Sequence, residues 1–123
     1  MRAHSLWASF GYAVAGLRYV VTTQRNFRIH LAAGVAVFIL GVGLHLSHIE
    51  FAILAGVVMA VLLAELLNTI IETAIDLVSP EFHPLAKIAK DVAAGAVLLM
   101  AVGAICIGVI IFAPHLAWPR ALP

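Results

Sequence analysis

Three carboxylates and one amide recur along a single stretch of this sequence, from Glu65 to Asp76. The stretch follows fourteen uncharged, mostly aliphatic residues, Phe51 to Ala64, with no proline between the two segments. If one helix of 3.6 residues per turn runs through both, the carboxylates at positions 65, 72 and 76 fall within an arc of about 40°, and Asn68 lies roughly 60° to one side. Carboxylates on an otherwise apolar helix at membrane depth are costly and usually functional. This polar face is therefore the candidate site.

The residue types on this face suit phosphate chemistry. Carboxylate oxygens without a cysteine cluster favour a hard cation such as Mg²⁺. Lys90 and Asp91, after the next predicted loop, lie at a similar level. A divalent cation and a lysine are what phosphoryl transfer needs, since both neutralise charge on phosphate oxygens. A carboxylate at the membrane face could also accept the proton of a lipid hydroxyl. The chain has no GxxxxGK[ST] loop, which excludes the soluble ATP-binding folds built on that motif.

The spacing alone leaves two other interpretations open. Carboxylates inside a membrane also serve proton or cation transport, so a small protein of this kind could assemble into an ion or proton translocator. The same face could also be a structural polar seam between subunits. The residues by themselves do not separate an enzyme from a transporter.

Composition places the chain in a membrane. It has 123 residues, of which 64% are hydrophobic and 11% charged, and its mean hydropathy is +1.13. A soluble domain of this size cannot bury so much apolar side chain, so the sequence predicts a single all-α integral membrane domain. The net charge of +1 is spread over segment ends and gives no reason to expect a nucleic-acid partner.

Hydrophobic segments divide residues 1–123 into one surface helix and three transmembrane helices. Residues 6–23 are amphipathic, with aromatic and arginine side chains at the edges, as in a helix that lies at the lipid headgroups. Residues 29–46, 49–78 and 85–113 are long enough to cross a bilayer. A loop with two prolines separates the last two spans and carries Glu81 and His83. Pro114 is predicted to end the last helix, which leaves residues 114–123 as a tail.

Basic residues predict the orientation. Six of the seven lysines and arginines precede the first span or lie between the second and third spans. The positive-inside rule then places the N-terminus and residues 79–91 in the cytoplasm and the C-terminus outside. Counting about twenty residues inward from Ile49 places Glu65 just inside the hydrocarbon, Glu72 at the headgroups and Asp76 in water.

Over most of its length the sequence resembles the small prokaryotic diacylglycerol kinase family, which includes the undecaprenol kinases of Gram-positive bacteria. The resemblance covers roughly residues 10–112. It is carried by four motifs: Glu65-x-x-Asn68-Thr69-x-x-Glu72-x-x-x-Asp76, the run from Ala89 to Leu98, Gly16-Leu17-Arg18-Tyr19, and Arg25-Asn26-Phe27-Arg28-Ile29-His30.

This resemblance implies an ATP-dependent lipid kinase with Mg²⁺ as cofactor. It implies a homotrimer in a bacterial inner or plasma membrane, with active sites shared between neighbouring subunits at the cytoplasmic interface. It favours undecaprenol over diacylglycerol as the lipid alcohol, because the run that ends at His30 and the alanine at position 94 resemble the undecaprenol kinase branch.

The resemblance also implies roles for single residues. Glu65 matches the general base, with Asn68 beside it. Glu72 matches a ligand of the nucleotide-bound metal, and Lys90 matches a contact to the ATP phosphates. Asp76 and Asp91 match polar positions on the nucleotide side. In the loop, Glu81 and His83 match positions that serve either the active site or the ordering of the loop.

The chain departs from the family pattern at Gln24, where the family usually has a glutamate that serves as a second metal ligand. An amide oxygen can still bind Mg²⁺ but carries no charge, so the substitution predicts weaker metal binding and reduced activity. An inactive or catalytically weakened member of the family is the corresponding alternative.

Overall fold

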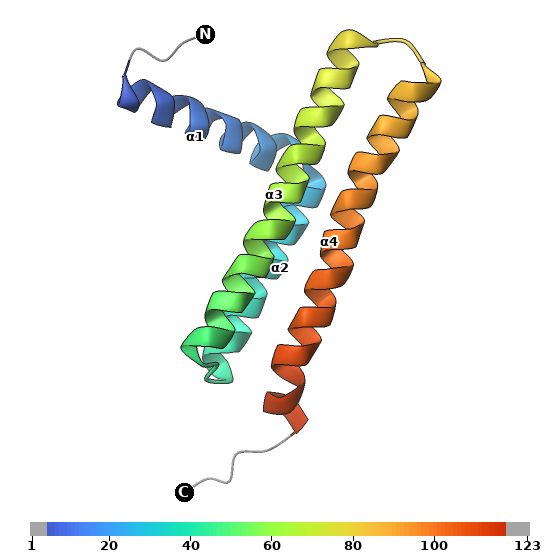
Figure 1. Cartoon of the computed structure of the whole chain (residues 1–123). Helices are drawn as coiled ribbons and strands as arrows, with labels where there is room; N and C mark the ends of the chain where they lie inside the picture. The colour runs from blue at the N-terminus through green and yellow to red at the C-terminus, as the bar shows by residue number, and fades with distance from the viewer. Residues whose placement is uncertain (1–4, 118–123) are drawn as a thin grey trace, which may run out of the picture.

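The computed structural model describes residues 5–117, and these form four α-helices with no strand among them. The helices are α1 (Leu6–Thr23), α2 (Arg25–Gly43), α3 (His48–Val78) and α4 (Pro84–Ala117) (Figure 1). The all-α class predicted from the sequence is confirmed.

Helices α2, α3 and α4 run side by side as an antiparallel bundle, and α1 projects away from it at a steep angle (Figure 1). Within α1 only Val20 is buried, so this helix makes little contact with its own bundle. Its first turn is capped by Ser5, whose Oγ accepts a hydrogen bond from the N–H of Ala8 at 3.2 Å. The structure thus has the surface helix that the amphipathic pattern predicts.

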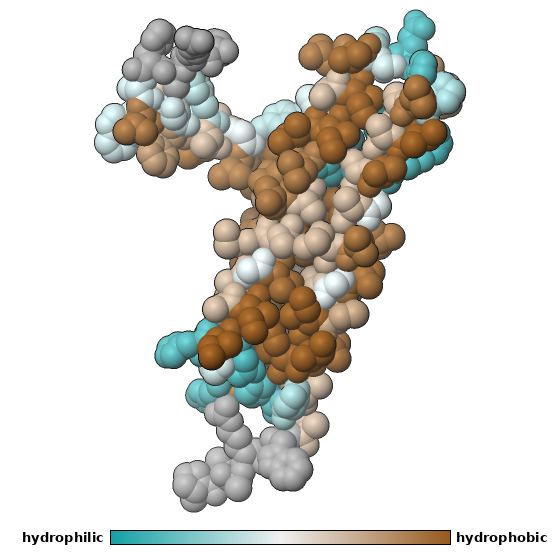
Figure 2. All heavy atoms as spheres, in the orientation of Figure 1, coloured by the Kyte–Doolittle hydropathy of each residue, from teal (hydrophilic) through white to brown (hydrophobic). Residues whose placement is uncertain are grey.

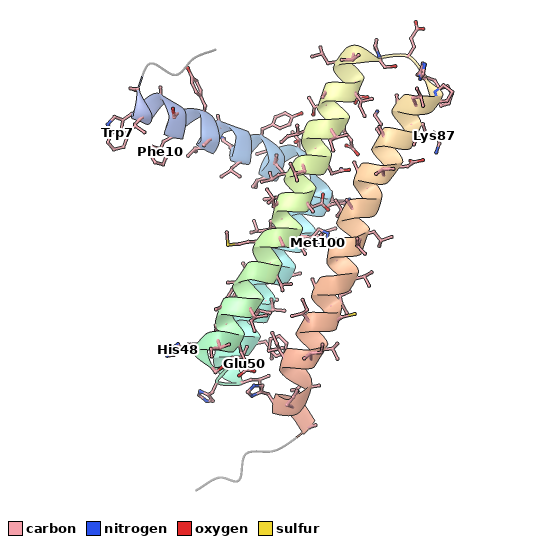
Figure 3. All side chains as sticks on the ribbon, in the orientation of Figure 1. Trp7, Phe10, His48, Glu50, Lys87 and Met100 are labelled. Carbon is pink, nitrogen blue, oxygen red and sulfur yellow. The ribbon has the colours of Figure 1, made fainter. Side chains whose placement is uncertain are left out.

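Among the described residues, three helices are long and apolar enough to cross a membrane: α2, α3 and α4. At 1.5 Å per residue, the 31 residues of α3 extend about 46 Å, well beyond a hydrocarbon core of about 30 Å. Hydrophobic side chains cover most of the visible face of the bundle, and hydrophilic ones gather at its two ends (Figure 2). Lys87 lies at one end and His48 and Glu50 lie at the other (Figure 3). The chain is therefore a multi-pass membrane protein whose long helices overhang the bilayer.

The first span begins earlier than the hydrophobic run suggests. Helix α2 covers Arg25–Gly43, whereas hydrophobicity indicates residues 29–46. A single extended residue, Gln24, separates α1 from α2, so the basic residues after it are already helical. At the other end α2 closes in a Schellman turn: His45 has a φ of 56°, and the N–H of Leu46 bonds to the carbonyl of Gly41 at 3.1 Å.

The prediction that the last helix ends at Pro114 is wrong, because α4 continues to Ala117. Proline removes one backbone donor but does not forbid a further turn where other contacts hold it. Here His115 Nε2 lies 2.7 Å from Glu50 Oε2 in the first turn of α3. That contact ties the last turn of α4 to the bundle. Residues 118–123 of the predicted tail lie outside the described residues.

Close packing between α2 and α3 depends on Gly34. A Cβ atom added there would lie 2.7 Å from Cγ1 of Val58, a side chain that its helix holds in one rotamer. We expect Gly34→Ala to lower the free energy of unfolding by about 1–3 kcal/mol, the usual cost of overpacking. Gly56→Ala is the matched control, since nothing lies within 4 Å of its added Cβ. Denaturation in detergent measures both; equal stability of the two variants would contradict the packing assignment.

Candidate active site

Glu65 is buried inside the apolar part of the bundle. It is 3% exposed, and with Thr69, one turn later, it is one of the two polar residues among the buried ones described. Its Oε1 atom lies 3.2 Å from Nε2 of His30 on α2, within ion-pair distance. The geometry is not that of an aligned hydrogen bond, and within residues 5–117 Oε1 has no other partner. A buried carboxylate oxygen is therefore held next to a basic side chain without being saturated.

Asn68 and Glu72 form the next pair along α3. The side-chain amide of Asn68 donates from Nδ2 to Oε1 of Glu72 at 3.2 Å. The carbonyl oxygen of the same amide, Oδ1, is buried and has no partner in the described part of the chain. A carboxylate and a free amide oxygen are the hard donors that Mg²⁺ prefers, so the chemistry of this pair fits a magnesium ion.

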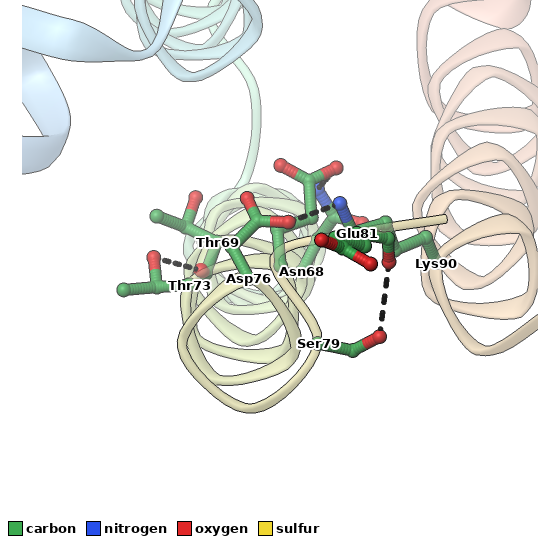
Figure 4. Close-up of polar contacts among 8 residues, drawn as sticks. Asn68, Thr69, Thr73, Asp76, Ser79, Glu81 and Lys90 are labelled. Atoms are coloured by element: carbon green, nitrogen blue, oxygen red, sulfur yellow. Dashed lines mark hydrogen bonds and ion pairs between the residues drawn. The ribbon is translucent and has the colours of Figure 1, made fainter. Parts of the chain in front are cut away.

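Asp76 and Lys90 join the two long helices near the loop end of the bundle. Nζ of Lys90 on α4 forms an ion pair with Oδ1 of Asp76 on α3, although the two residues are 14 positions apart. Figure 4, which looks along α3, shows Lys90 paired with Asp76. The ion pair brings the candidate phosphate-binding lysine to the helix that carries the candidate base.

A hollow of about 390 Å³ lies between the loop and the start of α4. Six of its lining residues are ionisable: Asp76, Glu81, His83, Lys87, Lys90 and Asp91. Lys87 Nζ contacts Asp91 Oδ2 at 2.5 Å, one turn apart on α4. Every residue predicted for the nucleotide side, except Glu72, therefore lines this hollow.

The loop residues also order the backbone. The hydroxyl of Ser79 donates to the main-chain carbonyl of Glu81 at 3.1 Å. Nδ1 of His83 accepts the N–H of Leu85 at 3.1 Å, which satisfies a free donor in the first turn of α4. His83 therefore caps the first turn of α4, and its ring also lines the hollow.

Gln24 lies at the junction of α1 and α2, where its Nε2 donates to Oγ1 of Thr23 at 3.2 Å. Within residues 5–117, no three His, Cys, Asp or Glu side chains group closely enough to hold a metal ion. The carboxylate of Glu72 accepts a hydrogen bond from the amide of Asn68, whose carbonyl oxygen has no partner in residues 5–117. A complete magnesium site would need further oxygen atoms, from the nucleotide, from water or from a neighbouring subunit.

An apolar groove of about 560 Å³ runs between α2, α3 and α4. His30 lines one part of it and Leu116, in the last turn of α4, lines another. Val61, one turn from Glu65, is also on its wall. The groove therefore extends along the membrane-spanning part of the bundle and reaches the neighbour of the buried carboxylate.

Two residues of this site are only weakly indicated by the sequence. His30 stands there as the end of a family motif, and nothing in its own helix indicates that it meets Glu65. Lys87 shares a helix face with Lys90 and Asp91, and its spacing of four from Asp91 predicts the observed ion pair.

Comparison with known proteins gives a consistent result. The sequence profile described as prokaryotic diacylglycerol kinase matches residues 11–112. A protein of Synechocystis named diacylglycerol kinase is 50% identical over 115 residues, which are 93% of this chain and 66% of that protein; the aligned part thus spans just under two thirds of that relative. A Bacillus subtilis protein named undecaprenol kinase is 46% identical over 108 residues, 88% of each chain. Escherichia coli diacylglycerol kinase is 30% identical over 105 residues, 85% of this chain and 86% of that protein.

Proposed function

This chain belongs to the prokaryotic diacylglycerol kinase family, a family of lipid kinases, and we propose that it transfers the γ-phosphate of ATP, bound with Mg²⁺, to the hydroxyl of a membrane lipid alcohol. The observation that carries the proposal is the change in environment along α3, from buried and apolar at Glu65 to polar and exposed at Asp76. Glu65 is buried in the apolar part of the bundle, whereas Asp76 and Lys90 pair beside the polar hollow. One helix thus joins a lipid-side carboxylate to a water-side phosphate site.

We propose the following roles, which these positions support. Glu65 accepts the proton of the lipid hydroxyl as the hydroxyl oxygen attacks the γ-phosphorus; the bond between that phosphorus and the oxygen it shares with the β-phosphate breaks, and ADP leaves. The ammonium group of Lys90 leaves Asp76 partly or wholly to bind phosphate oxygens. Glu72 and the free carbonyl oxygen of Asn68 would hold Mg²⁺, with Gln24 as a weaker ligand, and a cation held there would supply neutralisation of charge on the phosphates. Asp91, held by Lys87, contributes to the nucleotide side of the hollow.

The apolar groove supports a lipid substrate, because a long hydrocarbon chain requires an apolar surface beside the reacting hydroxyl. Undecaprenol is our preferred lipid and diacylglycerol the second, in line with the motif that ends at His30. The relatives include a diacylglycerol kinase and an undecaprenol kinase, so the lipid itself must be assayed.

We place the protein in a bacterial inner or plasma membrane, with the N-terminus and residues 79–91 in the cytoplasm, the C-terminus outside, and three copies in the active assembly. The basic residues support this orientation, since Lys87 lies at the loop end and Glu50 at the opposite end (Figure 3). The many exposed apolar side chains of the single chain support contact with lipid or with further copies.

The deciding experiment supplies γ-labelled ATP and each lipid alcohol separately to the purified protein in mixed micelles. We expect labelled lipid phosphate in the presence of Mg²⁺ and none without it, with undecaprenol preferred. Transfer to neither lipid, together with ion flux in liposomes that contain no ATP, would instead favour the translocator.

Gln24 gives a second test of the metal site. We expect Gln24→Glu to lower the Mg²⁺ concentration required for half-maximal activity, because a charged carboxylate replaces a neutral amide oxygen. Gln24→Ala should raise that concentration or leave it unchanged, and it also removes the hydrogen bond to Thr23. An unchanged Mg²⁺ dependence in Gln24→Glu would show that this side chain is not a ligand.

A further inference from the structure

His30 is the side chain through which α2 reaches the candidate base. Its Nε2 atom lies 3.2 Å from Oε1 of Glu65, and the two side chains are 25% and 4% exposed. No other ion pair to Glu65 occurs in the described part of the chain. His30 also lines the apolar groove, so one side chain borders both the groove and the carboxylate.

The fold holds this histidine in place on both sides. Phe27 and Gly34, three residues before it and four after it, are both buried and share its helix face. The missing side chain at Gly34 lets Val58 of α3 approach α2 closely. The contact between His30 and Glu65 is therefore fixed by the packing of the two helices rather than by flexible surface side chains.

A buried carboxylate needs such a neighbour. An unpaired ionised group in an apolar environment is strongly destabilised, and a buried acceptor without a donor carries a similar, smaller penalty. Oε1 of Glu65 has no aligned hydrogen bond. A modest movement of the imidazole ring would let Nε2–H donate to it. The second carboxylate oxygen would then remain available for the hydroxyl of a substrate.

We propose that His30 is a positioning residue for lipid phosphorylation: its Nε2–H holds Oε1 of Glu65, so that the other carboxylate oxygen faces the lipid hydroxyl. The inference rests on the proposed function. His30 itself takes no proton from the substrate and touches neither phosphate nor metal. Its contribution is to keep the base in the one rotamer that can accept the proton.

The test compares two substitutions at the same position. His30→Leu removes the donor, and we expect kcat to fall about 10- to 100-fold, the cost of misplacing a catalytic group by around an ångström. The KM for ATP should stay near that of the wild type. His30→Gln keeps an N–H at a comparable distance along the side chain and should restore most of kcat. His48→Leu, at the far end of the bundle, is the matched control and should leave kcat unchanged.

Coupling to Glu65 separates positioning from a structural effect. In a Glu65→Asp background the carboxylate is already displaced, so His30→Leu should cost much less there than in the wild type. Equal costs in both backgrounds, an unchanged kcat in His30→Leu, or equal losses in the glutamine and leucine variants would each overturn the inference. A wild-type protein that phosphorylates neither lipid would instead overturn the proposed function and, with it, this role. Size-exclusion and thermal unfolding profiles confirm that each variant is folded.

Discussion

Glu65→Gln should lower kcat by about 10²- to 10⁴-fold while the KM for ATP changes little, because a general base contributes a factor of that size. Glutamine has nearly the same shape but its amide cannot take a proton from the lipid hydroxyl. Glu65 is 3% exposed, so no water-filled space is available for a solvent base to replace it easily. The nucleotide site around Asp76 and Lys90 lies further along the helix and should bind ATP as before.

The measurement is steady-state transfer from labelled ATP to the preferred lipid, with nucleotide affinity followed separately by equilibrium binding. Glu50→Gln is the matched control, since Glu50 is a glutamate on the same helix but at the opposite end, in contact with His115. That substitution should leave kcat near the wild-type value. Near-normal turnover in Glu65→Gln would remove Glu65 from the role of base, whatever the control shows.

The polar face of α3 could be predicted because it depends only on helical period. Once the helix is continuous through residues 51–76, the positions of Glu65, Asn68 and Asp76 follow from 3.6 residues per turn. The helix periodicity therefore sufficed for the centre of the candidate site.

Contacts between helices were harder to predict from the sequence. The approach of His30 to Glu65 depends on how α2 is rotated against α3, and that rotation depends on the fit of Val58 against Gly34. A glycine in a helical segment does not indicate which residue of a neighbouring helix packs against it, so the fit of Val58 against Gly34 could not be predicted from the sequence. The ion pair of Lys90 with Asp76 was partly foreseeable, because a short loop leaves the two helices adjacent with both residues near their loop ends.

The ends of helices show the same distinction. Pro114 predicts a stop by local rules, yet the contact of His115 with Glu50 holds one more turn. The two residues are 65 positions apart, and their meeting requires that α3 and α4 be aligned in register. Local propensity therefore gives approximate helix ends, and packing against a neighbouring helix sets the final ones.

The ammonium group of Lys90 is paired with the carboxylate of Asp76. For Lys90 to bind phosphate, as proposed, this ion pair must loosen or open. Phosphate oxygens carry more charge than one carboxylate, so ATP should draw the lysine toward itself. Asp76 then either guides the lysine toward the phosphates or competes with the phosphates for it.

Lys90→Ala is expected to lower kcat/KM for ATP by about 10- to 100-fold, because a hydrogen bond to a charged group contributes about 1.5–3 kcal/mol. The loss should be the same with either lipid, since the lysine touches only phosphate. Lys87→Ala is the control: Lys87 lines the same hollow, but its exposed ion pair with Asp91 contributes little. Equal losses in the two variants would mean that overall positive charge, rather than Lys90, attracts the nucleotide.

Asp76→Asn decides between guiding and competing. If Asp76 guides the lysine, the amide loses the charge that holds Lys90 near the α3 polar face, and the KM for ATP rises. If Asp76 competes, the freed lysine binds phosphate more readily and the KM for ATP falls. Because Lys90 is 37% and Asp76 63% exposed in their side chains, water screens the pair and either change should be modest beside the effect of Lys90→Ala. The direction of the change, rather than its size, therefore carries the answer, and the Lys90→Ala Asp76→Asn double variant should show no further effect of the aspartate when the lysine is absent.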